Sequence, residues 1–423
     1  MPEPSRIGIF RPLAHRDFRL LWTGLAVSLL GDGIYLVAIA WLVLGIYDLK
    51  ALSLIGLAWT LPTVLLLLVT GVLTDRLPRR RLMLIADGVR LFAIGTMGVL
   101  TITGQVRLWH LIVLAALYGA GEALFGPANS AILPDLVPAE QLVQANSLAQ
   151  FVRPFAQMLI GPAVGGVLVR TVGPGWAFIL DAATFAWSAS MILRMTERPA
   201  VRHADADSTH WADLKEGFRF VRSRTWLWAS MGIATVSLLC FWGPFEVLVP
   251  YLIKKELHGS ALDLGLVFAA GGLGSIIAAA ISGQRGMPRR PLTVMYAAWA
   301  FGTFLLIGFG FARSLWPMFL VSALCQAMFT ILMVNWFTVF QLLVPTHIRG
   351  RVSSLDWFIS TAGVPVSFAL TGPIAAVLGA RQTLIWAGAV GGVVIVLTAL
   401  FVPGILAPER DGSLAAGRSA EPL

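Results

Sequence analysis

The sequence predicts an all-α membrane protein with twelve transmembrane helices in two six-helix pseudo-repeats. Of its 423 residues 57% are hydrophobic and only 13% are charged, whereas soluble domains average about 25% charged. Twelve apolar stretches approach the roughly 20 residues that a helix needs to cross the hydrocarbon core. Helices are expected because backbone groups in lipid must bond within their own segment.

The expected helices occupy most of the chain. They begin near residues 18, 51, 81, 108, 142, 175, 225, 260, 291, 314, 351 and 381. The predicted domains are a cytoplasmic N-terminal segment (1–17), a first bundle (18–195), a cytoplasmic linker (196–224), a second bundle (225–406) and a cytoplasmic tail (407–423). The linker is charged, and its stretch WADLKEGFRFVRS predicts an interfacial helix.

The two predicted bundles resemble each other in sequence. A shift of 207 residues places 116–148 on 323–355, with the tripeptide LVP in both at the same point. At nearby offsets, PRR recurs in the loops after the second and eighth spans, and GP recurs in the fifth and eleventh. Parallel repeats of six spans are typical of transporters whose substrate site lies between the halves near the midplane.

The distribution of Lys and Arg predicts the orientation. The side that holds both termini collects 22 of the 31 basic residues and the opposite side seven, while Arg90 and Arg153 lie inside spans. The positive-inside rule then places both termini in the cytoplasm. The expected location is the inner or plasma membrane. Because basic residues fill short gaps between apolar runs, the net charge of +9 does not indicate nucleic-acid binding.

Several function classes lack their sequence signals. The two cysteines, Cys240 and Cys325, lie in apolar runs and indicate no disulfide or metal framework. No GxxxxGK[ST] loop is present, so direct use of ATP is not expected. The six histidines lie at span ends or in loops, and no nucleophile constellation is visible. We therefore expect no cofactor, no metal site and no enzymatic activity.

Three ionisable residues inside spans are the predicted proton-coupling residues: Asp32, Glu122 and Arg153. A charged residue at the bilayer centre costs about 2.5–3.5 kcal/mol on insertion scales, so each one needs a reason. Asp32 lies about 15 residues into the first span, which is roughly 20 Å along the helix and near the midplane. Two roles are open for Asp32. It binds a proton and a cationic substrate group alternately, or it is a structural group that hydrogen-bonds Ser28 or a neighbouring helix.

Glu122 and Arg153 leave comparable alternatives open. Glu122 shares a helix face with aromatic rings, which suits an organic cation, or it is paired with an arginine. A buried arginine such as Arg153 normally has an acidic partner, for which Asp32 and Glu122 are the candidates, and the pair is either proton-gated or purely structural. The second bundle places Phe241, Phe329 and Ser360 at the corresponding positions, so any proton chemistry is expected mainly in the first bundle.

The predicted substrate cavity has one wall in each bundle. The first wall follows the helix faces of Asp32 and Glu122, and the second follows the tenth span. Its predicted residues are Ser28, Tyr35, Tyr118, Phe125, Asn129, Gln326, Phe329, Thr330, Met333 and Phe337. An apolar wall with a few hydrogen-bonding groups suits a bulky lipophilic ligand, although the same residues also suit ordinary packing.

Two motifs carry a family resemblance. The loop GVLTDRLPRRRL resembles the gating motif of the major facilitator superfamily, and GPAVGG resembles the motif of its exporters. The gating motif comprises Gly71, Asp75, Arg76, Arg79 and Arg80, and the exporter motif comprises Gly161, Pro162, Gly165 and Gly166. The resemblance implies that Asp75 locks onto the start of the eleventh span, whereas the arginines by themselves suit a role in topology only.

The resemblance narrows to one branch of that superfamily. SLLGDG, PANSAILPDLVPAEQLVQANSL and GPAVGGVL are similar to drug-efflux proteins that include macrolide exporters and enterobactin-type siderophore exporters. This implies a monomeric secondary transporter that exports an amphiphilic antibiotic, drug or siderophore-like product by proton antiport with alternating access. The fourth-span arginine of many family antiporters is absent, and Glu122 lies in that span. A phospholipid flippase, an uptake carrier and a non-transporting membrane sensor are the alternatives.

Overall fold

The computed structural model describes residues 10–196, 210–411 and 414. Within these ranges, the side chains at 67–69, 71–76, 139, 143, 210–214 and 346–347 are not described. The described part of the chain is helical without strands, and twelve of its segments are long and apolar enough to cross a membrane. Each begins within three residues of its predicted start, which confirms the twelve expected spans.

Packing divides the chain into two compact units. The first contains Met1–Arg202 and Ile253–Leu273, and the second contains His203–Leu252 and Gly274–Leu423. The boundary crosses helix α11 (Ala261–Arg285), whose first half belongs to the first unit. The domain boundaries expected from the sequence stay a prediction.

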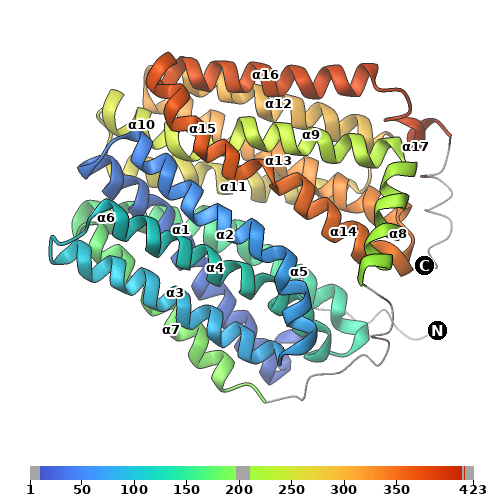
Figure 1. The fold of residues 1–423 in the computed structure, drawn as a ribbon, viewed down its shortest axis with the longest axis horizontal. Coiled ribbons are helices and arrows are strands. Elements are labelled where there is room, and N and C mark those ends of the chain that lie inside the picture. The colour runs from blue at the N-terminus through green and yellow to red at the C-terminus, as the bar shows by residue number, and fades with distance from the viewer. Residues whose placement is uncertain (1–9, 197–209, 412–413, 415–423) are drawn as a thin grey trace. The chain divides into compact units, whose positions relative to one another are not determined.

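The first unit is built around five pairs of neighbouring helices. Its spans are α1 (Arg16–Ile46), α2 (Leu49–Arg76), α3 (Arg79–Ile102), α4 (Leu108–Ile132), α5 with α6 (Leu142–Val152, Gly161–Thr171) and α7 (Pro174–Leu193). Helix α1 packs against α7 and α6, α7 against α3, α3 against α4, and α4 against α2 (Figure 1).

The second unit repeats four of these pairs. Its spans are α9 (Thr225–Gly243) with its extension as far as Leu252, the second half of α11, α12 (Pro291–Phe311), α13 (Leu315–Leu343), α14 with α15 (Thr346–Thr361, Gly363–Leu378) and α16 (Ala380–Phe401). Helix α9 packs against α16 and α15, α12 against α16, and α12 against α13 (Figure 1). Because spans 7, 9, 10, 11 and 12 meet as spans 1, 3, 4, 5 and 6 do, the two units are pseudo-repeats.

Prolines explain where spans deviate from a regular helix. In the fifth span a π-helical segment, Arg153–Ile160, separates α5 from α6, and Pro154 and Pro162 remove two backbone donors there. The eleventh span, which was expected as one helix, consists of α14 and α15 joined at Ala362. Pro365 cannot donate to the carbonyl of Thr361, so the helical ladder is interrupted at this joint.

The predicted helix in the linker is present as α8 (His210–Ser223). It packs against α14 and α9 of its own unit. Glu216 accepts an ion-paired hydrogen bond from Arg351 of α14. Gly217 is buried against Arg351 and Leu355, so α8 lies close along the start of the eleventh span.

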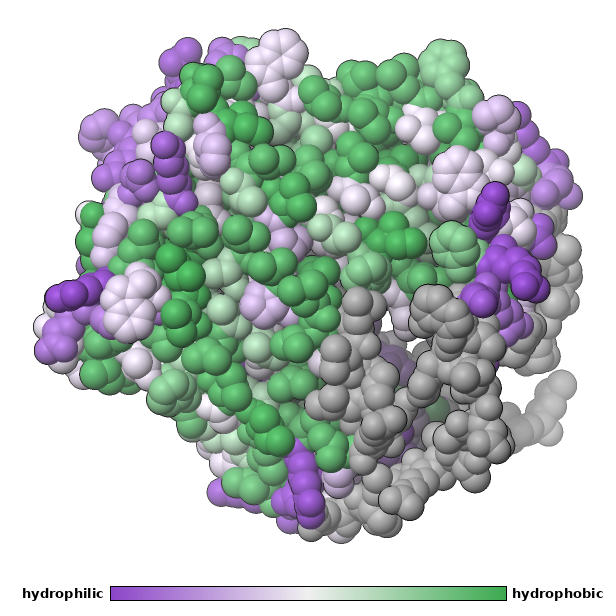
Figure 2. Space-filling model, in the orientation of Figure 1, coloured by the Kyte–Doolittle hydropathy of each residue, from purple (hydrophilic) through white to green (hydrophobic). Residues whose placement is uncertain are grey.

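Large apolar side chains remain exposed on the helices. Trp316 is 81% exposed and Val377 is 85% exposed, as expected for side chains that face lipid rather than water. On the face drawn in Figure 2, apolar residues cover most of the surface along the helices and hydrophilic residues gather towards the helix ends. This distribution fits the membrane-spanning assignment of the twelve segments.

Candidate functional site

Helices α1, α2, α3, α4 and α7 of the first unit enclose a group of polar residues, which we call the buried polar cluster. It comprises Asp32, Trp59, Asp87, Arg90, Tyr118, Glu122 and Asp181. The sequence predicted Asp32, Tyr118 and Glu122 from this set. The other four come from helices two, three and six of the bundle, and only the fold brings them together.

Asp32 lies on α1 and is 8% exposed. The Tyr118 hydroxyl on α4 donates to its Oδ1 atom over 2.7 Å. Ser28, one of the two partners considered from the sequence, instead donates to the backbone oxygen of Leu25 over 3.2 Å. The neighbouring helix is therefore the partner of Asp32.

The glycines on either side of Asp32 allow close helix contacts. A Cβ atom at Gly33 would lie 2.5 Å from the Gln157 backbone oxygen and 2.8 Å from the Pro162 ring. A Cβ atom at Gly31 would collide with the side chains of Asp181 and Thr184 on α7. Because α1 touches the fifth span on one side of Asp32 and α7 on the other, the backbone around this carboxyl group is tightly held.

Glu122 is half-buried on α4, one turn after Tyr118. Its Oε2 atom accepts a hydrogen bond from the Trp59 indole nitrogen on α2 over 2.8 Å. The Tyr118 ring packs against the Trp59 ring, with 6.1 Å between ring centroids, and against the Tyr35 ring, with 4.7 Å between ring centroids. Within the described part of the chain, neither Asp32 nor Glu122 forms an ion pair with Lys or Arg.

Arg90 is the buried cation of this cluster. It is 4% exposed and forms an ion pair with Asp87, which lies one turn earlier on α3 and is fully buried. The guanidinium carbon lies 4.5 Å from the ring centroids of both Phe125 and Phe185, so two cation–π contacts stabilise the group. An acid and a base three residues apart in an apolar helix are the sequence signal that indicates such a pair.

Asp181 is a further buried acid of this cluster. It is fully buried on α7 opposite Gly31. Its Oδ1 atom accepts a hydrogen bond from Thr184 over 3.4 Å. The sequence alone could not show that this helix turns Asp181 inward.

Arg153 does not form the ion pair expected for it. Its side chain is exposed and donates to Oε1 of Gln157 over 3.0 Å, one turn further along the same span. Arg153 therefore forms a hydrogen bond within its own span in place of an ion pair with Asp32 or Glu122. A role for Arg153 in proton coupling stays a prediction. No ion pair of Arg153 with Asp32 or Glu122 supports it.

The predicted cavity residues lie in two different units. Ser28, Tyr35, Tyr118 and Phe125 are buried in the first, and Asn129 is half-buried. In the second, Gln326, Phe329, Thr330 and Met333 are half-buried and Phe337 is exposed. Phe329 contacts Trp242 with 6.4 Å between ring centroids, and Thr330 donates to the Gln326 backbone. That these residues form one substrate cavity stays a prediction.

The arginines of the gating motif tie helix ends together. Arg79 donates to the Ala131 backbone over 2.7 Å and to Asp135 over 2.6 Å, at the end of α4. Arg80 donates to the backbone oxygens of Ile192 and Leu193 at the end of α7. Cations at helix C-termini are favoured by the helix dipole. The expectations for Gly71, Asp75 and Arg76 lie outside the residues whose side chains are described.

The exporter motif has two packed faces. A Cβ atom at Gly165 would lie 2.9 Å from the Ile34 Cα atom on α1, and one at Gly166 would lie 2.8 Å from the Ala261 oxygen on α11. Gly161 faces α1 as Gly165 does, and Pro162 lies in the first turn of α6. The motif therefore lets α6 approach α1 and the start of α11 at backbone distance.

The second unit holds an acid that the sequence reasoning missed. Asp356 on α14 is 9% exposed and accepts hydrogen bonds from the Trp336 indole over 3.0 Å and from Ser360 over 3.2 Å. Its position inside the eleventh span is the signal that could have found it. Ionisable groups are therefore buried in both units, not in the first alone.

Comparison with known proteins identifies the family. The family described as transmembrane secretion effector matches residues 7–414. The chain belongs to the major facilitator superfamily. It is a multi-pass membrane transporter, and the relatives below are transporters rather than enzymes.

Two curated relatives of this superfamily member are exporters. The enterobactin exporter EntS of Citrobacter koseri is 31% identical over 354 residues, which cover 81% of this chain and 80% of that protein. The multidrug efflux pump Tap of Mycolicibacterium fortuitum is 28% identical over 377 residues, which cover 84% and 88%.

Solved structures share the fold at lower identity. A POT family transporter in complex with a thioalcohol-conjugated peptide matches 92% of this chain and 96% of its own, with a TM-score of 0.73 and 14% identity. A bacterial homologue of the iron transporter ferroportin matches 91% and 99%, with a TM-score of 0.68 and 18% identity. These matches support the fold alone.

Proposed function

We propose that this transporter exports an amphiphilic organic compound, such as an antibiotic, a drug or a siderophore-like product, in exchange for protons. Its direction and substrate class are supported by the exporter and efflux relatives. The proton as coupling ion is supported by the buried polar cluster. We place both termini in the cytoplasm and expect a monomer in the cell membrane.

The main support for the proposal is that the buried polar cluster contains more acidic groups than basic groups. Asp32, Asp87 and Asp181 are buried around one buried guanidinium, Arg90. Arg90 is paired with Asp87, and the hydrogen-bond donors described for Asp32 and Asp181 are neutral hydroxyl groups. A carboxyl group held only by neutral donors inside a membrane protein is a natural site for a proton or a cationic substrate group.

Asp32 is the residue best placed to exchange that proton. It lies on the first span, and its only described hydrogen bond joins it to α4, which also carries Glu122. In the proposed cycle, Asp32 and Glu122 release protons to the cytoplasm, bind the substrate, and take up protons again outside. The two bundles alternate in access around a site near the midplane.

The test is substrate-driven proton flux in inverted membrane vesicles, with ethidium and a macrolide as probes. We expect Asp32→Asn to reduce the flux by about tenfold or more, the effect of losing about 1.4 kcal/mol of coupling. The control is Asp48→Asn, because Asp48 accepts the backbone N–H of Ala51 over 2.9 Å and asparagine caps a helix equally well. Unchanged flux in Asp32→Asn refutes the role of Asp32.

The same vesicles test the direction and the cargo. Accumulation of the probe inside inverted vesicles corresponds to export from the cell, and depletion corresponds to uptake. Competition of probe transport by phospholipid indicates a flippase, and probe binding without flux indicates a sensor. Either of these outcomes, or net uptake, overturns the proposed exporter.

A further inference from the structure

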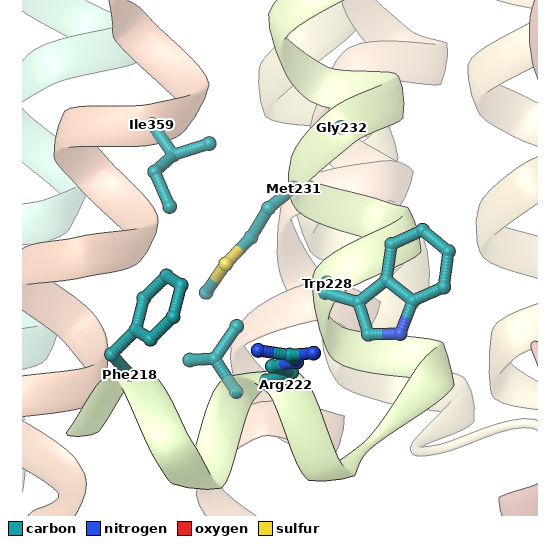
Figure 3. Close-up of a pocket in the computed structure, with 7 residues that line it drawn as sticks. Phe218, Arg222, Trp228, Met231, Gly232 and Ile359 are labelled. Carbon is teal, nitrogen blue, oxygen red and sulfur yellow. The ribbon is translucent and has the colours of Figure 1, made fainter. Parts of the chain in front are cut away.

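The second unit contains a cavity of about 440 Å³ between α8, α9 and α14 (Figure 3). This volume is in the range of small-ligand sites, about 300–1,000 Å³. Its lining consists of Phe218, Val221, Arg222, Trp228, Met231, Gly232 and Ile359. The cavity shares no residue with the predicted substrate walls or with the buried polar cluster.

The lining is apolar except for one cation. Arg222 supplies a guanidinium, no acidic residue lines the cavity, and no described residue forms an ion pair with Arg222. Figure 3 shows the Arg222 guanidinium and the Trp228 indole at the end of the cavity next to α8. Two side chains that carry hydrogen-bond donors, Arg222 and Trp228, therefore line one end of an apolar space.

The helices arrange this cavity with a polar end and an apolar end. Figure 3 shows α8 running crosswise beneath the cavity, with Phe218 and Arg222 one turn apart on the face towards it. Helix α9 rises at one side with Trp228, Met231 and Gly232, and Ile359 of α14 lies at the other. At Gly232 an added Cβ atom would meet no atom within 4 Å, so the apolar end is open.

We propose that this cavity binds one anionic phospholipid. Its phosphate accepts charge-assisted hydrogen bonds from Arg222 and a hydrogen bond from the Trp228 indole. One acyl chain follows Met231, Gly232 and Ile359 along α9 and α14. Trp228 is 47% exposed at the start of the seventh span, and tryptophan is enriched at that depth because one end of the ring is polar and the rest is apolar.

Charge and surface chemistry favour a lipid over other occupants. Arg219 and Arg224 are exposed next to Arg222 on and just after α8, so the polar end of the cavity attracts an anion. A free phosphate ion would satisfy Arg222 but would leave six uncharged lining residues in contact with water. An amphiphile with a phosphate head and an apolar tail satisfies both ends. The inference does not depend on the proposed export function.

The test measures lipid binding to the purified full-length protein by native mass spectrometry and by thermal stabilisation. The probes are phosphatidylglycerol, phosphatidylcholine with the same chains, and inorganic phosphate. We expect wild type to retain phosphatidylglycerol in preference to phosphatidylcholine. Arg222→Gln removes the cation, and Gly232→Leu fills the open end. Each variant is expected to weaken phosphatidylglycerol binding by about fivefold or more. A loss of this size is roughly the effect of one basic contact at the membrane surface.

Two matched variants serve as controls. Arg219→Gln removes an exposed cation of α8 that does not line the cavity, and Gly88→Leu adds the same side chain on α3, where a Cβ atom also meets nothing within 4 Å. Both are expected to bind phosphatidylglycerol as wild type does. Equal loss in Arg219→Gln and Arg222→Gln, equal retention of both lipids, or full displacement of lipid by inorganic phosphate overturns the proposal.

Discussion

Replacing Gly33 by alanine tests how closely α1 and the fifth span approach beside Asp32. The added Cβ atom would lie 2.5 Å from the Gln157 oxygen, 2.8 Å from the Pro162 Cδ atom and 2.9 Å from the Gly161 Cα atom. Cβ atoms in proteins essentially never approach other atoms within 3.0 Å. These three atoms belong to backbone or to a proline ring, so no side-chain rotation relieves the overlap.

The expected loss of stability follows from these contacts. Overpacking a well-packed interior costs about 1–3 kcal/mol. Alanine in place of glycine also favours a helix by about 0.5–1 kcal/mol. Gly88→Ala on α3 receives this gain without the overlap, because its Cβ atom meets nothing within 4 Å. The difference between the two variants therefore isolates the overpacking cost.

The assay is thermal unfolding of both purified variants in the same detergent. At about 2–4 °C per kcal/mol for a unit of this size, Gly33→Ala is expected to unfold about 2–12 °C below Gly88→Ala. Transport by Gly33→Ala should also fall, because the displaced α1 carries Asp32. If both variants unfold at the same temperature, the backbones of α1 and the fifth span do not meet at Gly33.

Two further substitutions test buried polar contacts by thermal unfolding. Asp87→Asn leaves the Arg90 charge buried without its ion pair, which is expected to cost about 3–5 kcal/mol; a loss under about 1 kcal/mol contradicts the buried pair. Trp336→Phe removes the indole that donates to Asp356 over 3.0 Å and is expected to cost about 1–3 kcal/mol. Trp316→Phe is its control, since Trp316 is 81% exposed, and equal effects of the two would show that the hydrogen bond adds no stability.

Much of the architecture can be predicted from the sequence because the bilayer imposes a simple rule. Apolar stretches of sufficient length must become helices, so all twelve spans were found with their starts within three residues. The near-constant offset between the halves predicted the pseudo-repeats, and the same pairs of helices meet in both units. Local proline effects, as at the joint between α14 and α15, were missed because proline is tolerated inside membrane-spanning helices and does not by itself mark where a helix ends.

The candidate site could be predicted only in part. Asp32 and Glu122 were found because an acid in an apolar stretch stands out by itself, and Tyr118 because it shares a helix face with Glu122. Their partners on other helices could not be found: Trp59 meets Glu122 across 63 residues of sequence, and the rings around Arg90 come from two other helices. The expected ion pair of Arg153 with Asp32 or Glu122 was wrong for the same reason, because contacts between helices cannot be found from the sequence of one helix.

For this chain, the sequence by itself determined the membrane class, the twelve spans, the repeat and the presence of acids within the bilayer. Only the tertiary structure decided which of those acids face one another and which have a cation beside them. Helices that are apolar around most of their circumference do not reveal which face will be buried, because lipid and protein interior are equally apolar. Helix packing decided that Asp181 lies against Gly31, the neighbour of Asp32, and that Arg153 bonds to Gln157.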